Sequence, residues 1–101
     1  MSTRQPTEAA RQRAAEHLAQ QAADALTAAG LPKAHATTTG WDTHPIPGEV
    51  HVRQHGGTIW AKNEAAETYA ATLRAAGLPA TIPTPGTVLI PATLDAQERP
   101  A

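Results

Sequence analysis

The sequence predicts an α+β fold, with two helices packed on one face of a small, mainly antiparallel sheet, in the order α-β-β-β-α-β. Two Ala-rich segments of helical periodicity predict the helices, and each ends in the letters AAGLP. Short segments that alternate or are rich in Thr and Val predict the strands. A length of 101 residues fits one domain. The expected organisation is a flexible N-terminus (1–6), an α+β domain (7–91) and a polar C-terminal tail (92–101).

The first helix is predicted from Thr7 to the AAGLP at 28–32. Thr7 is the expected N-cap, because its hydroxyl can accept a hydrogen bond from a free amide of the first turn. Gly30 is the expected stop, since it adopts the left-handed conformation at little cost, and Pro32 prevents continuation. The apolar stripe consists of Ala10, Ala14, Leu18, Ala22, Ala25, Leu26 and Ala29.

The second helix is predicted from Asn63, as its N-cap, to Gly77. A further similarity links the two halves, because IPGEVHV (46–52) resembles TPGTVLI (84–90). The repeats favour an internal α-β-β duplication, with an insertion around TGWDTHP in the first copy. The alternative is that Ala-rich helices simply tend to end in Gly-Leu-Pro.

The strands are predicted from composition and alternation. Gly56-Gly57 is a two-residue linker of the kind that suits the positive φ angles of a tight hairpin turn. The expected strands are 34–41, 49–55, 58–62 and 87–91, with a short extra strand near 80–83.

A tight turn at Gly56-Gly57 would sort the side chains of a 49–62 hairpin onto two faces. The helix-facing side would carry Val50, Val52, Ile59 and Ala61. The outer side would place Arg53 directly across from Trp60. The expected binding residues on this outer face are His51, Arg53, His55, Trp60 and Lys62.

Composition predicts a small core and self-association. Hydrophobic residues make up 41 % of the chain, but 23 of them are Ala, and Val, Ile and Leu together supply 14. Burying surface against a second copy would relieve this shortage, so a homo-oligomer is expected. The lack of cysteine and of any long apolar run favours a cytoplasmic protein without membrane association. The Ala, Pro, Thr and Arg bias suggests a bacterial source.

Catalysis and metal binding are disfavoured. The chain has no Cys, and its only Ser is Ser2 near the start. Asp42 and His44 form an Asp-x-His pair in an expected loop and are weak candidates for a metal site. No recognised ligand spacing accompanies them, so neither a metal nor a cofactor is predicted, and the protein is expected not to be an enzyme.

The sequence therefore predicts a small protein-binding or adaptor module, self-associating, that uses the outer face of the 49–62 hairpin. The alternative is a nucleic-acid-binding accessory protein, in which Trp60 stacks on a base while Arg53 and Lys62 contact phosphates. A net charge of −1 weakens this alternative. A third interpretation is that the face is merely solvated, with the Arg53–Trp60 pair stabilising the hairpin.

Overall fold

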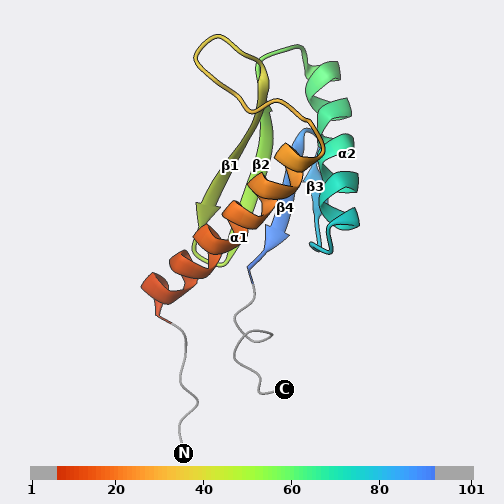
Figure 1. Ribbon diagram of the computed structural model, residues 1–101. Helices are drawn as coiled ribbons and strands as arrows, with labels where there is room; N and C mark the ends of the chain where they lie inside the picture. The colour runs from red at the N-terminus through yellow and green to blue at the C-terminus, as the bar shows by residue number, and fades with distance from the viewer. Residues whose placement is uncertain (1–6, 93–101) are drawn as a thin grey trace, which may run out of the picture.

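The computed structural model describes residues 7–92 as a four-stranded antiparallel sheet with two helices on one face (Figure 1). The α+β class and the placement of the helices are confirmed. The predictions for residues 1–6 and for residues 93–101 lie outside the described part of the chain. The elements are α1 (Glu8–Ala28), β1 (Gly40–Ile46), β2 (Glu49–His55), α2 (Ile59–Ala75), β3 (Thr81–Thr84) and β4 (Thr87–Pro91).

The element order along the chain is α-β-β-α-β-β, because the strand expected at 58–62 is instead the first turn of α2. The strand order in the sheet is β1-β2-β4-β3. Strand β2 is thus paired on both sides, with β1 and β4, and has no free edge for residues 58–62. The extra strand expected near 80–83 exists as β3, whereas most of 34–41 forms the connection from α1 to β1.

Both hairpins turn at a Pro-Gly pair. Ile46 pairs with Glu49 around Pro47-Gly48, and Thr84 pairs with Thr87 around Pro85-Gly86. Proline presets φ at the first turn position, and the following glycine has φ +93° at Gly48 and +85° at Gly86. The predicted turn at Gly56-Gly57 is wrong as a hairpin. These two glycines have positive φ angles but lead from β2 into α2.

The repeated AAGLP is a helix-terminating motif in both places. At the end of α1, the amide of Leu31 donates to the carbonyl of Leu26, and the amide of Gly30 donates to that of Thr27. At the end of α2, the amides of Leu78 and Gly77 make the equivalent bonds to Leu73 and Arg74. This is the Schellman pattern, with glycine in the left-handed position.

The core lies between the helices and the inner face of the sheet. Val50 and Val52 of β2 are fully buried, as predicted, against the Ala-rich stripes of α1 and α2. The largest buried side chain is Trp41 on β1, whose indole Nε1 donates to the carbonyl of Leu31 at 3.0 Å. The other core residues are Ala15, Leu18, Ala19, Ala22, Leu26, Ala66, Tyr69, Ala70, Leu73, Ala80, Val88 and Ile90.

The two α-β-β units are related by an approximate twofold arrangement at the centre of the sheet. His51 of β2 pairs with Leu89 of β4, and these two positions correspond in the repeated strand sequence. The repeat aligns Val50 with Val88 and Val52 with Ile90. In the sheet the pairing is crossed: Val50 pairs with Ile90, and Val52 pairs with Val88. The arrangement is what two paired copies of one unit would give, although descent from a duplication stays a prediction.

Within residues 7–92, neither helix combines the length and the hydropathy needed to cross a membrane.

Candidate binding site at the start of helix α2

Three of the five predicted binding residues come together at one end of the molecule. Arg53 and His55 are among the last three residues of strand β2, and Lys62 lies on the first turn of helix α2. All three line one pocket of about 480 Å³, which we call the α2 pocket. Its other lining residues are Gln54, Ile59, Asn63, Pro85, Gly86 and Thr87.

The α2 pocket occupies a notch in the sheet. Strand β4 begins at Thr87, opposite Arg53, so the last two residues of β2 extend beyond it. The turn between β3 and β4 lies close to α2, because a Cβ built on Gly86 would be 3.4 Å from Asn63 Oδ1. In Figure 1 the β3–β4 turn and the start of α2 lie at the end of the sheet remote from the β1–β2 turn. Three elements therefore converge on the pocket: β2, α2 and the β3–β4 turn.

Helix α2 starts earlier than the sequence suggested. Thr58, not Asn63, is the N-cap: its Oγ1 accepts a hydrogen bond from the amide of Ala61 at 3.1 Å. The Asn63 cap is therefore a wrong prediction, and Asn63 sits inside the helix. Gly56 and Gly57, at φ +87° and +90°, turn the chain out of β2 so that Thr58 can cap the helix.

This early start leaves two large apolar side chains in water. Ile59 is 74 % exposed and Trp60 is 80 % exposed, and both belong to the first turn of α2. Trp60 is exposed as predicted, but on a helix, and Arg53 is not its cross-strand partner. Ile59 was expected to face the core and does not, because helical geometry replaces strand alternation at this position. We call Ile59, Trp60, Arg53, His55 and Lys62 together the Trp60 surface.

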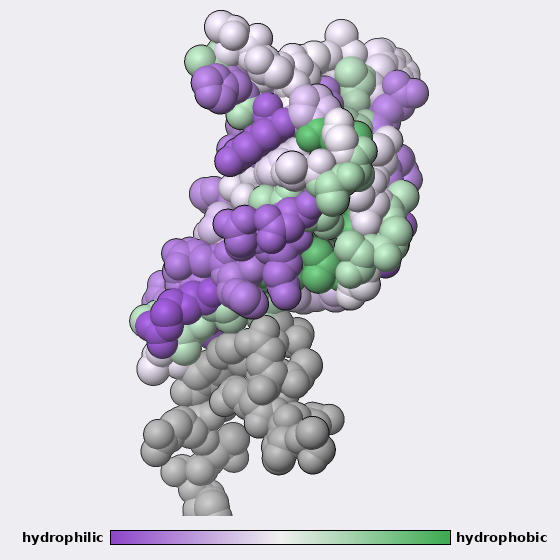
Figure 2. All heavy atoms as spheres, viewed as in Figure 1, coloured by the Kyte–Doolittle hydropathy of each residue, from purple (hydrophilic) through white to green (hydrophobic). Residues whose placement is uncertain are grey.

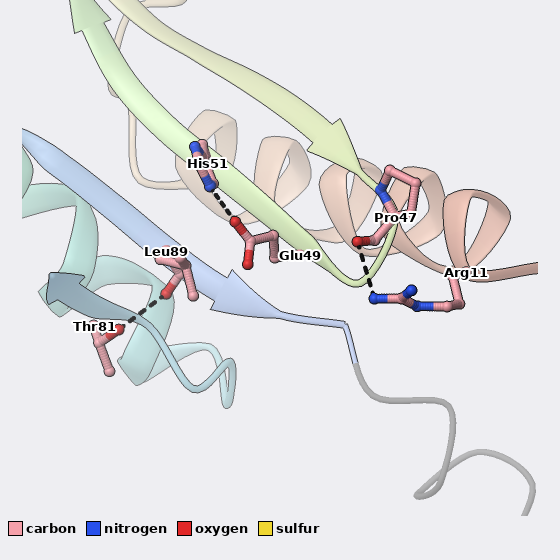
Figure 3. Close-up of polar contacts among 6 residues, drawn as sticks. All are labelled: Arg11, Pro47, Glu49, His51, Thr81 and Leu89. Atoms are coloured by element: carbon pink, nitrogen blue, oxygen red, sulfur yellow. Dashed lines mark hydrogen bonds and ion pairs between the residues drawn. The ribbon is translucent and has the colours of Figure 1, made fainter. Parts of the chain in front are cut away.

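His51, the fifth predicted residue, lies elsewhere. It is half-buried at the middle of β2, on the sheet face that the helices do not cover, and its Nε2 is 2.5 Å from Glu49 Oε2 (Figure 3). Its direct neighbours across the strands are His44 on β1 and Leu89 on β4. His51 is therefore separate from the α2 pocket.

The weak metal candidates lie on a strand and not in a loop. Asp42 and His44 both belong to β1, which replaces the insertion expected around TGWDTHP. Asp42 Oδ2 lies 3.4 Å from Nε2 of His55, and both side chains are at least half exposed. Within residues 7–92, no three His, Cys, Asp or Glu side chains come together as a metal site would require.

Gln54, one of the residues that line the pocket, is held in place by two hydrogen bonds. Its Oε1 accepts a hydrogen bond from the hydroxyl of Tyr69 at 3.3 Å, and its Nε2 donates to the carbonyl of Gly56 at 3.2 Å. Tyr69 is buried, and desolvation by this burial raises the pKa of its hydroxyl. Gln54 thus links the core to the segment that leads into α2.

The sequence analysis missed Ile59, Asn63 and the β3–β4 turn as parts of the site. One signal was available: Thr58 precedes an unbroken run of good helix formers and follows two glycines, as an N-cap often does. The contribution of the Pro85-Gly86 turn had no local signal, because it depends on β4 pairing with β2.

No protein-family model matches the chain, and comparisons with curated proteins and with solved structures found no significant match.

Proposed function

We propose that this protein is a non-enzymatic protein-binding module that self-associates through the Trp60 surface. The observation that carries the proposal is the exposure of two consecutive large apolar residues, Ile59 at 74 % and Trp60 at 80 %. Tryptophan is among the residues that contribute most to protein–protein binding when a partner covers it. A single exposed apolar residue needs no explanation, but two consecutive large ones favour an interface.

The charges near Trp60 favour a second copy of the chain as the partner. Glu64 and Glu67 follow Trp60 at helical spacing and are exposed, so they extend the same face of α2. Arg53 and Lys62 lie beside the first turn of that helix. In a twofold contact a patch meets itself, so the cations of one copy can face the carboxylates of the other.

The surface of the molecule supports this choice of face. Figure 2 shows hydrophilic residues gathered over α1, while paler and apolar residues occupy more of the α2 side of the same view. The exposed face of α1 is therefore less suited than the exposed face of α2 to burial against a partner.

Analytical ultracentrifugation over a range of concentrations tests the proposal. The wild-type protein is expected to approach twice the chain mass of 10.5 kDa as its concentration rises. Trp60→Ala is expected to shift the dissociation constant upward by about tenfold or more, because a buried tryptophan anchor contributes roughly 2 kcal/mol or more.

His17→Ala is the matched control, because it removes an exposed ring from the other helix. It is expected to dimerise like the wild type. A wild-type protein that remains monomeric at every concentration would refute self-association.

Nucleic-acid binding is a second candidate, favoured by the 80 % exposed indole of Trp60 and by the three basic side chains that line the α2 pocket. It requires base stacking on Trp60 together with phosphate contacts. Binding of oligothymidine that weakens with salt and is lost in Trp60→Ala would support it. No binding at low salt would remove it.

A further inference from the structure

The α2 pocket is lined by two charged side chains, Arg53 and Lys62, that form no ion pair in the described part of the protein. Among residues 7–92, neither Arg53 nor Lys62 takes part in an ion pair or in a side-chain hydrogen bond. The third basic side chain, His55, lies 3.4 Å from the carboxylate of Asp42. No carboxylate side chain is among the lining residues of the pocket itself.

The remaining lining residues provide neutral donors and an apolar wall. The side-chain amides of Gln54 and Asn63 supply further hydrogen-bonding groups, and Ile59 and Pro85 supply apolar surface. A volume of about 480 Å³ falls within the range of pockets that hold small ligands or short peptide segments. Charged and amide donors beside an apolar wall match a carboxylate carried on an aliphatic side chain.

We propose that the α2 pocket binds a carboxylate of an acidic peptide segment in a partner protein. Arg53 presents a planar guanidinium that can engage a carboxylate through two parallel hydrogen bonds, and Lys62 contributes a point charge from the opposite wall. Ile59 packs against the methylene groups of the bound Glu or Asp. The proposal rests on the proposed protein-binding function but concerns a different contact from the one that Trp60 makes.

The arrangement suits a peptide better than a nucleic acid. Nucleic-acid affinity comes mainly from neutralising many phosphates along a basic surface. Here the cations converge on one pocket, Glu64 and Glu67 lie further along the same helix, and the chain carries a net charge of −1. One or two carboxylates match this local charge, whereas a continuous phosphate backbone would meet those acidic residues.

Fluorescence anisotropy with a labelled hexaglutamate peptide at low ionic strength tests the proposal. The wild type is expected to bind hexaglutamate and to bind hexaglutamine much more weakly, because only the former carries carboxylates. Arg53→Gln and Lys62→Gln are each expected to weaken hexaglutamate binding by about tenfold or more, which is the scale of one hydrogen bond to a charged group.

Arg13→Gln is the charge-matched control, because Arg13 is an exposed arginine on α1 and lies outside the pocket. It is expected to change hexaglutamate binding by less than about twofold, since an exposed charge outside the pocket makes no hydrogen bond to the ligand and interacts with it only weakly through water. Equal weakening by Arg13→Gln and Arg53→Gln would overturn the proposal, because the attraction would then be nonspecific. Failure of hexaglutamate to bind at low salt would overturn it as well.

Two further arms separate this proposal from the others. Trp60→Ala is expected to lose dimerisation and to retain hexaglutamate binding, because Trp60 is not among the residues that line the pocket. A dimer that does not bind the peptide thus refutes only the pocket proposal, and a monomer that binds it refutes only self-association. Tighter binding of oligothymidine than of hexaglutamate, dependent on Arg53 and Lys62, would replace the peptide with a nucleic acid.

Discussion

Trp41 and Trp60 occupy opposite environments in the same small molecule. Trp41 is 1 % exposed and is bracketed by the segment after α1: its amide donates to the carbonyl of Pro32, and its carbonyl accepts from the amide of Ala34. The Lys33 ammonium lies 5.7 Å from the centre of the Trp41 ring. In a core made largely of Ala and Val, this one indole fills a large share of the volume. Trp60 contributes almost nothing to the same core.

Trp41→Ala is expected to destabilise the fold by about 3–5 kcal/mol, because it removes buried aromatic area and leaves a cavity. Trp60→Ala is expected to change the stability of the monomer by less than about 0.5 kcal/mol, as is usual for exposed positions. Urea unfolding measures the stability of both variants, at a protein concentration low enough to keep the chain monomeric. Similar midpoints for the two variants would contradict the assignment of Trp41 to the core.

At the level of elements, the start of α2 decides which residues form the site. If the helix began at Asn63, residues 58–62 would be extended and Ile59 would face the opposite side from Trp60. Because Thr58 caps the helix, Ile59 lines the α2 pocket and Trp60 lies on the same turn, in solvent. The helix start therefore links the proposed interface to the proposed pocket.

Thr58→Ala is expected to lower stability by about 1 kcal/mol, the usual cost of losing an N-cap hydroxyl. Thr58→Ser keeps the hydroxyl and is expected to stay close to the wild type. Asn63→Ala is expected to have little effect or to stabilise slightly, since Ala favours a helix interior. Thermal unfolding followed by circular dichroism measures all three. A larger loss of stability for Asn63→Ala than for Thr58→Ala would contradict the assignment of Thr58 as the N-cap.

At the scale of the whole molecule, the sheet order β1-β2-β4-β3 joins two α-β-β units into one domain. The central β2–β4 pairing brings the second hairpin beside the end of β2, and this completes the α2 pocket. The same pairing lets both helices share one core, in which Tyr69 of α2 reaches Gln54 of β2. The buried hydroxyl of Tyr69 is expected to make the stability of the folded chain depend on pH.

Burial raises the pKa of Tyr69 above its ordinary value, so the folded state favours the neutral hydroxyl. This contribution to stability is fully present below a pH of about 10, where the unfolded tyrosine is also neutral, and is lost as pH rises through the folded pKa. Tyr69→Phe is expected to lose less stability in that alkaline window than the wild type does. Urea unfolding at neutral and alkaline pH measures the difference.

Because Tyr69 is the one tyrosine in the chain, phenolate absorbance follows its titration directly. The absorbance midpoint of the folded protein is expected to lie above that of the urea-unfolded protein. Equal midpoints, or equal alkaline losses in wild type and Tyr69→Phe, would contradict the role of burial. At neutral pH the variant should lose only the hydrogen bond to Gln54, about 0.5–1.5 kcal/mol.

The sequence by itself determined the features that depend on neighbouring residues. The Thr7 cap, the two Gly-Leu-Pro helix ends and the inward direction of Val50 and Val52 all follow from local periodicity and backbone preference. The exposure of Trp60 was also predicted, although from the wrong element. The sequence alone was thus enough to predict the fold class and three of the residues that line the pocket.

Only the tertiary structure decided between a strand and a helix at residues 58–62, because the segment suits either one locally. The deciding contacts are distant in sequence: β1 and β4 occupy both edges of β2, so the segment cannot form the predicted hairpin with β2. The α2 pocket arises for the same reason, since Pro85-Gly86 reaches Arg53 only through the pairing of β4 with β2. Pairing between remote strands has no signature in a local stretch of sequence, and for this reason the sequence named the cations but not the pocket.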